Sequence, residues 1–236
     1  MADYLPRELA DLARCGVPSD RTRAVEAFIE PIFIDGALTR RTKMVMLFLA
    51  ATAVGNEREG TRGITAALAS GLSRQELLDA LLAGALCRGA ALLWRGAQWL
   101  PMAPLNPDAR WGPPVPAASP EDMIGFLIEQ NPAGAVPVHE LAASAPDVLE
   151  AYYQLRSTVL ADGPFPRRHK ELMLVAINAA ERFERGVEVH LEASIACGAT
   201  LAEAAEALLV ATIVGGVPAW QAGAHVLARV RHAAAK

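Results

Sequence analysis

FPRRHKELMLVAINAAERFERGVEVHLEASIACGAT, residues 165–200, is the stretch that decides the fold. Apolar residues are dense on both sides of a polar cluster at residues 181–185, a pattern that predicts two helices joined by a turn. The first predicted helix begins near Arg167, after two prolines, and the second carries His190 on its apolar face. We expect Gly198 to end the second helix, because glycine adopts the left-handed conformation that follows many helix C-termini.

A third helix is predicted directly after this pair. Thr200 followed by Glu203 has the spacing of a capping box, in which each residue satisfies a free N–H group at the start of a helix. The whole chain has 53% hydrophobic but only 6% aromatic residues, with Ala and Leu abundant, and both are strong helix formers. No stretch alternates like a strand over a useful length. The predicted fold class is therefore all-α.

The same pattern occurs earlier in the chain. LTRRTKMVMLFLAATAVGNEREGTRG, which begins at Leu38, aligns with the segment from Phe165 at a constant offset of 127 residues and without a gap. Ser73 and Glu76 repeat the capping box. We interpret the match as an internal duplication, with two tandem copies of one helical unit. The matched pairs include Arg40/Arg167, Lys43/Lys170, Gly71/Gly198, Glu76/Glu203 and Gly89/Gly216.

A proline-rich stretch separates the two copies. Seven of the sixteen prolines fall between residues 101 and 120, and proline removes backbone donors and disfavours helix in the residue before it. We therefore predict an N-terminal repeat at residues 1–100, a linker at 101–120 and a C-terminal repeat at 121–236.

Charge and cysteine content exclude several classes of protein. The net charge of −4 and the pI near 5.8 disfavour a nucleic-acid-binding surface. The longest apolar runs, Met44–Gly55 and Ala207–Trp220, are shorter than the roughly 20 residues that span a bilayer, so we expect no membrane partner. The N-terminus shows no apolar leader, and three separated cysteines form no disulfide framework, which favours a cytoplasmic location. No His or Cys spacing resembles a metal site, and we expect no metal and no cofactor.

The order of features in the second copy resembles the carboxymuconolactone decarboxylase family, which includes the AhpD-like alkylhydroperoxidases. The resemblance rests on a basic pair leading into KEL, a single His on the next helix, a Gly-Ala-Thr turn with an acidic cap residue, and a GGxPA turn. It covers residues 146–225 well and residues 25–99 more weakly. It implies an AhpD-like all-α fold and assembly as a homo-oligomer, a dimer, trimer or hexamer.

Two residues of the second copy match functional positions of that family. His190 corresponds to the family His, and Glu171 to the acidic residue of KEL, so the resemblance implies that they are the catalytic pair. Imidazole transfers protons near neutral pH, and a carboxylate can orient it. We expect Arg168 and Arg185 to bind a substrate carboxylate, because guanidinium groups bind carboxylates bidentately. Ideal helices leave the pair roughly 7 Å apart in height, a gap that a crossing angle, a water or a neighbouring subunit would have to close.

The residues of the first copy and the absence of a Cys-x-x-Cys pair limit which reactions we expect and in which copy. At the 127-residue offset, Glu171 and His190 correspond to Met44 and Gly63, so only the second copy is predicted to be active. The peroxidase branch has a Cys-x-x-Cys pair before the His, but here Phe183 and Gly186 occupy those positions and the cysteines lie elsewhere. Thiol peroxidase activity is therefore disfavoured.

Three functional hypotheses follow from these residues. The first is a cofactor-free lyase or isomerase that acts by proton transfer on a small carboxylated or lactone-like metabolite. The second is an atypical alkylhydroperoxidase or peroxiredoxin-type antioxidant protein. The third is a non-catalytic helical binding or scaffold protein in which His190 is a core residue, since a His on an apolar helix face is more often structural than catalytic.

Overall fold

The computed structural model describes residues 6–101, 111–113, 115, 116, 118–131 and 134–234. In this part of the chain all regular structure is helical, which confirms the predicted all-α fold class. Much of the predicted linker, at 102–110, 114 and 117, lies outside the described residues. The elements are α1 (Pro6–Arg14), α2 (Ser19–Ile29), η1 (Glu30–Phe33), α3 (Arg40–Ala53), α4 (Glu57–Ala69), α5 (Arg74–Trp99), α6 (Pro120–Gln130), α7 (Ala135–Ser144), α8 (Pro146–Leu160), α9 (Arg167–Ala180), α10 (Glu184–Ala196), α11 (Leu201–Gly215) and α12 (Val217–Ala234).

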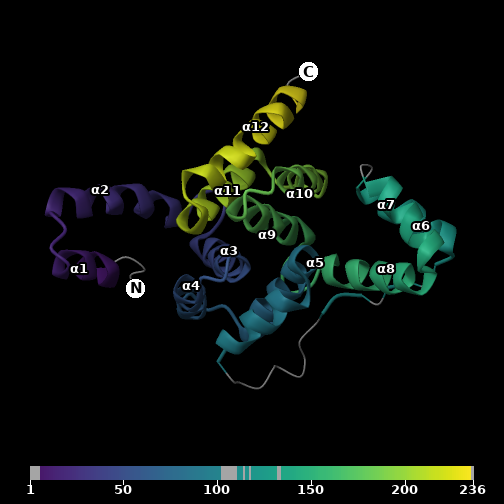
Figure 1. Cartoon of the computed structure of the whole chain (residues 1–236), viewed down its shortest axis with the longest axis horizontal. Helices are drawn as coiled ribbons and strands as arrows, with labels where there is room; N and C mark the ends of the chain where they lie inside the picture. The colour runs from purple at the N-terminus through teal and green to yellow at the C-terminus, as the bar shows by residue number, and fades with distance from the viewer. Residues whose placement is uncertain (1–5, 102–110, 114, 117, 132–133, 235–236) are drawn as a thin grey trace.

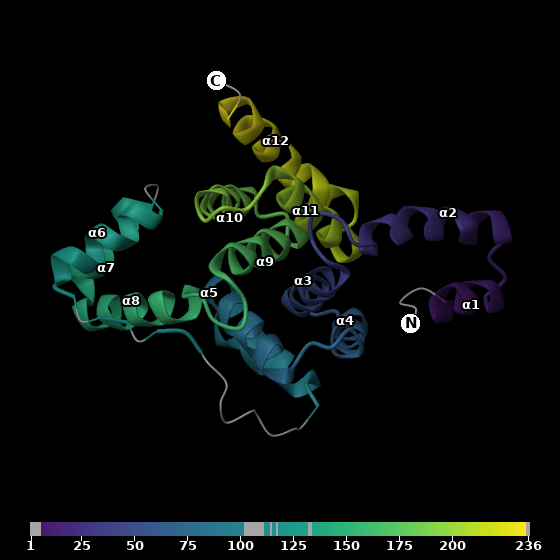
Figure 2. The ribbon, with the colours of Figure 1, turned by 180° about the vertical axis from the view of Figure 1, so that it is seen from behind.

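Helices α3 and α9 lie at the centre of the molecule (Figures 1 and 2). Every residue from Thr42 to Thr52 and from Lys170 to Ala180 is buried, as expected for helices that are apolar on nearly all sides. Helix α9 packs against α3, α5, α10 and α11, and α3 packs against α4, α5 and α11. A single hydrophobic cluster contains residues from both sides of the linker. The two halves therefore share one core. The predicted domain boundaries stay a prediction.

Local sequence signals account for the helix bounds near the centre. The predicted start at Arg167 is confirmed, and both predicted capping boxes are present, Ser73 with Glu76 and Thr200 with Glu203. The polar cluster at 181–185 is a turn only in its first part, because α10 already begins at Glu184.

Two helices on each side of the linker have the same bounds at the 127-residue offset. The first and last residues of α3 correspond to those of α9, and the first and last residues of α4 correspond to those of α10. The backbone also agrees at glycines with positive φ, since Gly89 has φ 66° and ψ −173° while Gly216 has φ 67° and ψ −173°. These agreements support two copies of one unit, and the duplication itself stays a prediction.

Two buried lysines join the halves reciprocally. Lys43 of α3 lies 3.0 Å from Glu206 of α11, and Lys170 of α9 lies 2.9 Å from Asp79 of α5. Each acid also accepts a backbone N–H at the start of the partner segment, from Leu38 and Phe165 respectively. Because a buried ammonium is costly without a counter-charge, each half depends on an acid supplied by the other.

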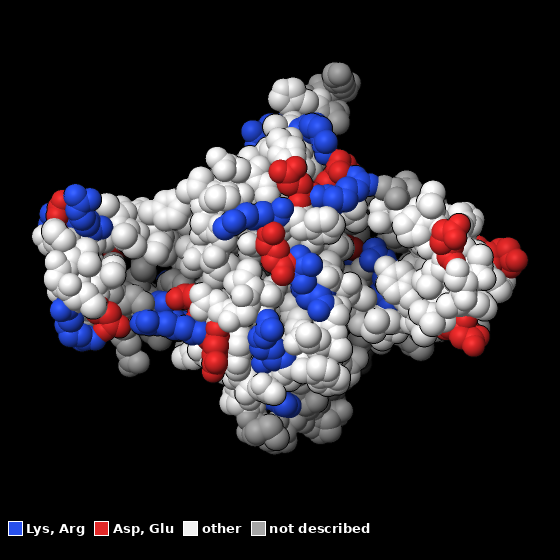
Figure 3. Space-filling view, viewed as in Figure 1, with Lys and Arg blue, Asp and Glu red and all other residues white. Residues whose placement is uncertain are grey.

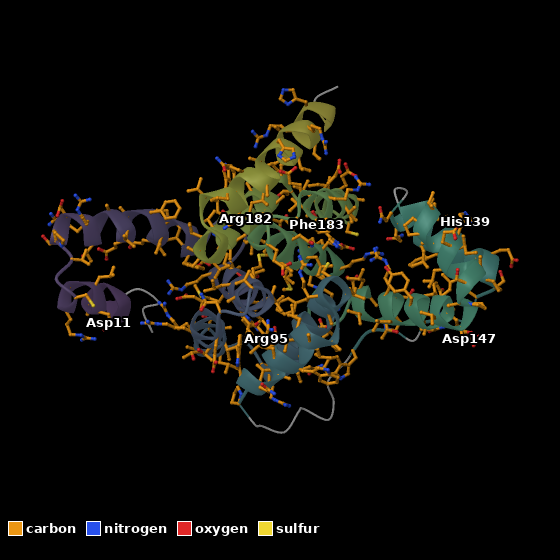
Figure 4. The ribbon with its side chains drawn as sticks, in the orientation of Figure 1. Asp11, Arg95, His139, Asp147, Arg182 and Phe183 are labelled. Atoms are coloured by element: carbon orange, nitrogen blue, oxygen red, sulfur yellow. The ribbon has the colours of Figure 1, made fainter. Side chains whose placement is uncertain are left out.

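Two helical groups extend from opposite sides of this centre. Helices α1 and α2 form an arm on one side, and α6, α7 and α8 form a group on the other (Figures 1 and 2). The α6–α8 group has its own small apolar cluster, which includes Met123, Leu127 and Tyr153. Figure 4 labels Asp11 on α1 and Asp147 on α8 at these two ends.

Helix α5 is long and apolar enough to cross a membrane by length and composition, a test that core helices also pass. Its backbone leaves the helical region at Gly89, so it consists of two shorter helices. Each piece is shorter than the roughly 20 residues that a transmembrane helix needs.

Charges are mixed on the surface that Figure 3 shows. Lys and Arg side chains lie among Asp and Glu side chains over most of this face, and at the outer end of the α6–α8 group the charged side chains in view are acidic. This face therefore lacks the concentrated positive charge with which proteins bind nucleic acid.

The buried Lys170–Asp79 pair gives a stability prediction. Asp79→Ala leaves the Lys170 ammonium with the carbonyls of Val159 and Ala161 but without its counter-charge. We expect the free energy of unfolding, measured by urea denaturation, to fall by about 3–5 kcal/mol. The double variant Asp79→Leu with Lys170→Met should regain most of this loss, because an apolar pair replaces the charges. An unchanged urea midpoint for Asp79→Ala would contradict the prediction.

Candidate functional site

Glu171 and His190 meet between the paired helices α9 and α10. His190 Nδ1 lies 2.8 Å from Glu171 Oε2, and both side chains are buried. The turn at residues 181–183 brings the two helices into extensive contact, so no water or neighbouring subunit is needed to close the height difference expected from ideal helices. The structure therefore brings together the two residues predicted as the catalytic pair.

A thiol from the other half completes the arrangement. Cys87 Sγ, from α5, lies 3.1 Å from His190 Nε2, the ring nitrogen that Glu171 does not contact. Asn178 Nδ2 donates to the same sulfur at 3.5 Å and to the Leu174 carbonyl at 2.7 Å. The inference that all three cysteines lie away from this site is wrong for Cys87. A thiol, an imidazole and a carboxylate in series are the arrangement found around activated nucleophiles.

Asn178 also explains why position 186 cannot carry a thiol here. A Cβ atom built on Gly186 would lie 2.2 Å from Asn178 Oδ1, so no side chain fits without a rearrangement. Position 186 is one of the two at which the peroxidase branch has cysteine. In this chain the thiol instead reaches the imidazole from α5, on the opposite side of the linker.

Burial and hydrogen bonding oppose each other on all three groups. Burial raises the pKa of Cys87, but the hydrogen bond with His190 and the imidazolium charge bring it below its ordinary value. Burial lowers the pKa of His190, yet its contacts with Cys87 and Glu171 raise it to about 9. Burial likewise raises the pKa of Glu171, but the hydrogen bond and charge of His190, together with the charges of Arg156 and Arg167, bring it below its ordinary value.

These shifts all act in the same direction. They favour a Cys87 thiolate, a His190 imidazolium and a Glu171 carboxylate, because each charged form stabilises the next. His190 then donates from Nδ1 to Glu171 and from Nε2 to the Cys87 sulfur. An imidazolium can supply a proton to a substrate, and a thiolate can accept one or act as a nucleophile.

Two arginines act on Glu171 in addition to His190. Arg167 Nε is 3.6 Å from Glu171 Oε1, and both atoms are buried without a hydrogen-bond partner. Arg156 of α8 also lowers the pKa of Glu171 through its charge. Both arginines line a cavity of about 510 Å³, whose other walls include Pro113, Val115 and Pro116. A chain of charged groups therefore leads from this cavity to the triad of Cys87, His190 and Glu171.

The arginines predicted to bind substrate lie elsewhere. Arg168 is exposed on α9, and Arg185 forms an ion pair with Glu188 on the surface of α10. Neither makes a contact with the Glu171–His190 pair among the described residues. Their role as substrate anchors stays a prediction, and the positions beside Glu171 belong to Arg156 and Arg167.

The equivalent place in the first half is closed. Met44 is fully buried in the core, and a Cβ atom on Gly63 would lie 2.9 Å from the backbone nitrogen of Phe48. The first half therefore has no polar pair of its own. It contributes Cys87 to the site of the second half, a role that the sequence analysis did not foresee.

Sequence spacing gave little signal for Cys87 and Arg156. Cys87 is 103 residues from His190, and Arg156 belongs to a helix outside the matched repeat. Within the described residues no group of three or more His, Cys, Asp or Glu side chains has the geometry to hold a metal ion.

A comparison with protein families places part of the chain. Residues 146–229, which comprise α8 to most of α12, match the sequence profile of the Carboxymuconolactone decarboxylase family. No curated protein matches the chain.

The triad predicts a pH profile for the reactivity of Cys87. Wild-type Cys87 should be alkylated by iodoacetamide at pH values below the ordinary thiol pKa of about 8.5, because His190 favours the ionised sulfur. In His190→Ala the cation is lost while burial remains, so the profile should move to higher pH. Peptide mass spectrometry resolves the site of alkylation. Cys197, whose pKa burial raises, is the internal control and should react only at alkaline pH. Identical Cys87 profiles in the two proteins would contradict the prediction.

Proposed function

Since residues 146–229 of this chain belong to the carboxymuconolactone decarboxylase family, we propose that the protein is a cofactor-free lyase or isomerase. It acts by proton transfer on a small carboxylated or lactone-like metabolite. The observation that carries the proposal is the 2.8 Å contact between Glu171 Oε2 and His190 Nδ1. The carboxylate fixes the orientation of the ring through Nδ1, which leaves Nε2, 3.1 Å from the Cys87 sulfur, as the position from which a proton can be transferred.

The triad supports a balanced decarboxylation. The bond between the carboxylate carbon and its neighbour breaks, CO₂ leaves, and the electron pair enters the conjugated system of the substrate. A proton must then be added to carbon, and the His190 imidazolium supplies it from Nε2. Solvent returns one proton to the imidazole for each turnover. For an isomerisation, the Cys87 thiolate removes a proton from one carbon and His190 returns a proton to another.

The position of Cys87 favours peroxide reduction as a second candidate. A thiolate attacks the terminal peroxide oxygen, the O–O bond breaks, and the products are a sulfenic acid and an alcohol. The His190 imidazolium protonates the leaving oxygen. In the described residues Cys15 and Cys197 make no contact with Cys87, so an external thiol would have to reduce the sulfenic acid.

Solvent deuterium tests the proton-transfer proposal. Purified protein is incubated in D₂O with a panel of unsaturated lactone carboxylates, and NMR follows loss of the carboxylate and uptake of deuterium at carbon. We expect one deuterium for each CO₂ released. His190→Ala should lower the rate about 10²–10⁴-fold, the usual contribution of a general acid. Glu171→Gln should lower it less, because the ring loses its anionic partner but remains. Full turnover by a folded His190→Ala variant would show that the assigned role is wrong.

A coupled assay separates the second candidate. Peroxide consumption is followed with dithiothreitol as the reductant, in wild type, Cys87→Ser and Cys15→Ser. A peroxide-reducing enzyme would lose activity in Cys87→Ser alone and would gain 16 Da at Cys87, the mass of one oxygen atom, when peroxide is added without a thiol. Cys15 is exposed and makes no contact with the triad, so Cys15→Ser is the matched control. Equal consumption by all three proteins would remove this candidate.

A further inference from the structure

The cavity beside the triad has the properties of a ligand site. Its volume is about 510 Å³, within the range of small-molecule pockets. Its walls come from α6, α8, the start of α9 and the three residues Pro113, Val115 and Pro116. Apolar side chains form most of the lining, including Val115, Phe126, Tyr153 and Leu160. Phe126 and Tyr153 meet edge to face, with ring centroids 5.5 Å apart, so one wall is a firm aromatic surface.

Arg156 is the most unusual group in this lining. It is only 7% exposed, yet it makes no hydrogen bond and no ion pair to another described residue. Buried arginines are normally paired, because an isolated charge loses its hydration without compensation. The charge of Arg156 acts on Glu171 at longer range, but its guanidinium donors are left for a group in the cavity.

Arg167 brings a second cation to the same wall. Its side chain donates to Gln130 of α6, and its backbone N–H donates to Asp162. Its Nε has no hydrogen-bond partner and lies 3.6 Å from Glu171 Oε1, with which it forms an ion pair. Arg167 therefore contacts the cavity on one side and the carboxylate of the triad on the other.

The acidic groups nearby are already engaged. Glu171 is hydrogen-bonded to His190, and the Asp162 carboxylate caps the N-terminus of α9 through the Arg167 N–H. Neither acid forms a hydrogen bond with Arg156. The cavity thus combines a cation without a direct partner, a second half-engaged cation and an apolar wall.

We infer that this cavity binds a carboxylate with an apolar body, the substrate class of the enzyme. The carboxylate pairs with Arg156 and Arg167, and the apolar body lies against Phe126 and Tyr153. Arg167 places the bound anion on the cavity side of Glu171, whose carboxylate is hydrogen-bonded to His190 Nδ1. This inference rests on the proposed function only where it calls the bound carboxylate a substrate.

Binding of a matched pair of probes tests the inference. The probes are 2-naphthylacetate and its uncharged amide, which share the aromatic body and differ in the charge. Isothermal titration calorimetry should show the carboxylate binding about 10-fold or more tightly than the amide, since charge-assisted hydrogen bonds are the stronger ones. Added salt should lower the affinity for the carboxylate probe and leave the affinity for the amide unchanged.

Two variants assign the difference to the arginines. Arg156→Met and Arg167→Met should each weaken naphthylacetate binding about 10-fold or more and leave the amide nearly unchanged. Arg21→Met, an exposed residue of α2 on the opposite side of the molecule, is the matched control and should change neither. Thermal unfolding followed by circular dichroism verifies that each variant is folded. Arg167 is only partly buried, so its variant remains informative if Arg156→Met is unstable.

The outcomes separate this inference from the proposed function. Arginine-dependent binding of naphthylacetate, retained in His190→Ala, supports the carboxylate site even if no lactone carboxylate is turned over. Equal binding of acid and amide, or acid binding unchanged in both arginine variants, overturns it. In the latter case Arg156 and Arg167 serve only as counter-charges to Glu171. His190-dependent turnover that is insensitive to Arg156→Met would leave the proposed function standing and this inference rejected.

Discussion

Burial of both central helices forces the charged groups that they carry to find partners inside the protein. Lys43, Lys170 and Glu171 lie on helices surrounded by other helices, where an unpaired charge is prohibitively costly. Each lysine is neutralised by an acid from the opposite half. Lys43 pairs with Glu206 of α11, and Lys170 pairs with Asp79 of α5. Glu171 is neutralised by His190. The way the halves interlock and the composition of the site both follow from this constraint.

The same constraint makes the site a joint product of the two halves. His190 has one nitrogen on Glu171, and the helix that delivers Asp79 to Lys170 also delivers Cys87 to the other nitrogen. Helix α5 therefore has a structural role near its start and a chemical one near Gly89, where its helical path is interrupted. A substitution that shifts α5 would disturb the stability of the core and the protonation of the triad together.

Chemistry near neutral pH depends on the mutual stabilisation of three charges. The thiolate and the carboxylate raise the pKa of His190 to about 9, and the imidazolium in turn lowers the pKa of both neighbours. Arg156 and Arg167 add positive charge on the cavity side of Glu171. A bound carboxylate would take part in this balance, so binding and proton transfer are expected to be coupled through Glu171.

The sequence by itself determined the local structure and half of the site. Capping boxes, glycines and the apolar pattern predicted where α9 and α11 begin and where α10 ends, because these signals act over a few residues. The match to a family profile and the spacing of KEL to His pointed to Glu171 and His190. Only the tertiary structure decided the remainder. Cys87 and Arg156 reach the site from helices that are distant in sequence, and Arg168 and Arg185 point to solvent. The physical reason is that the packing of one half on the other depends on the burial of charged groups and apolar surface between residues far apart in sequence. Such long-range contacts leave no spacing pattern along the chain.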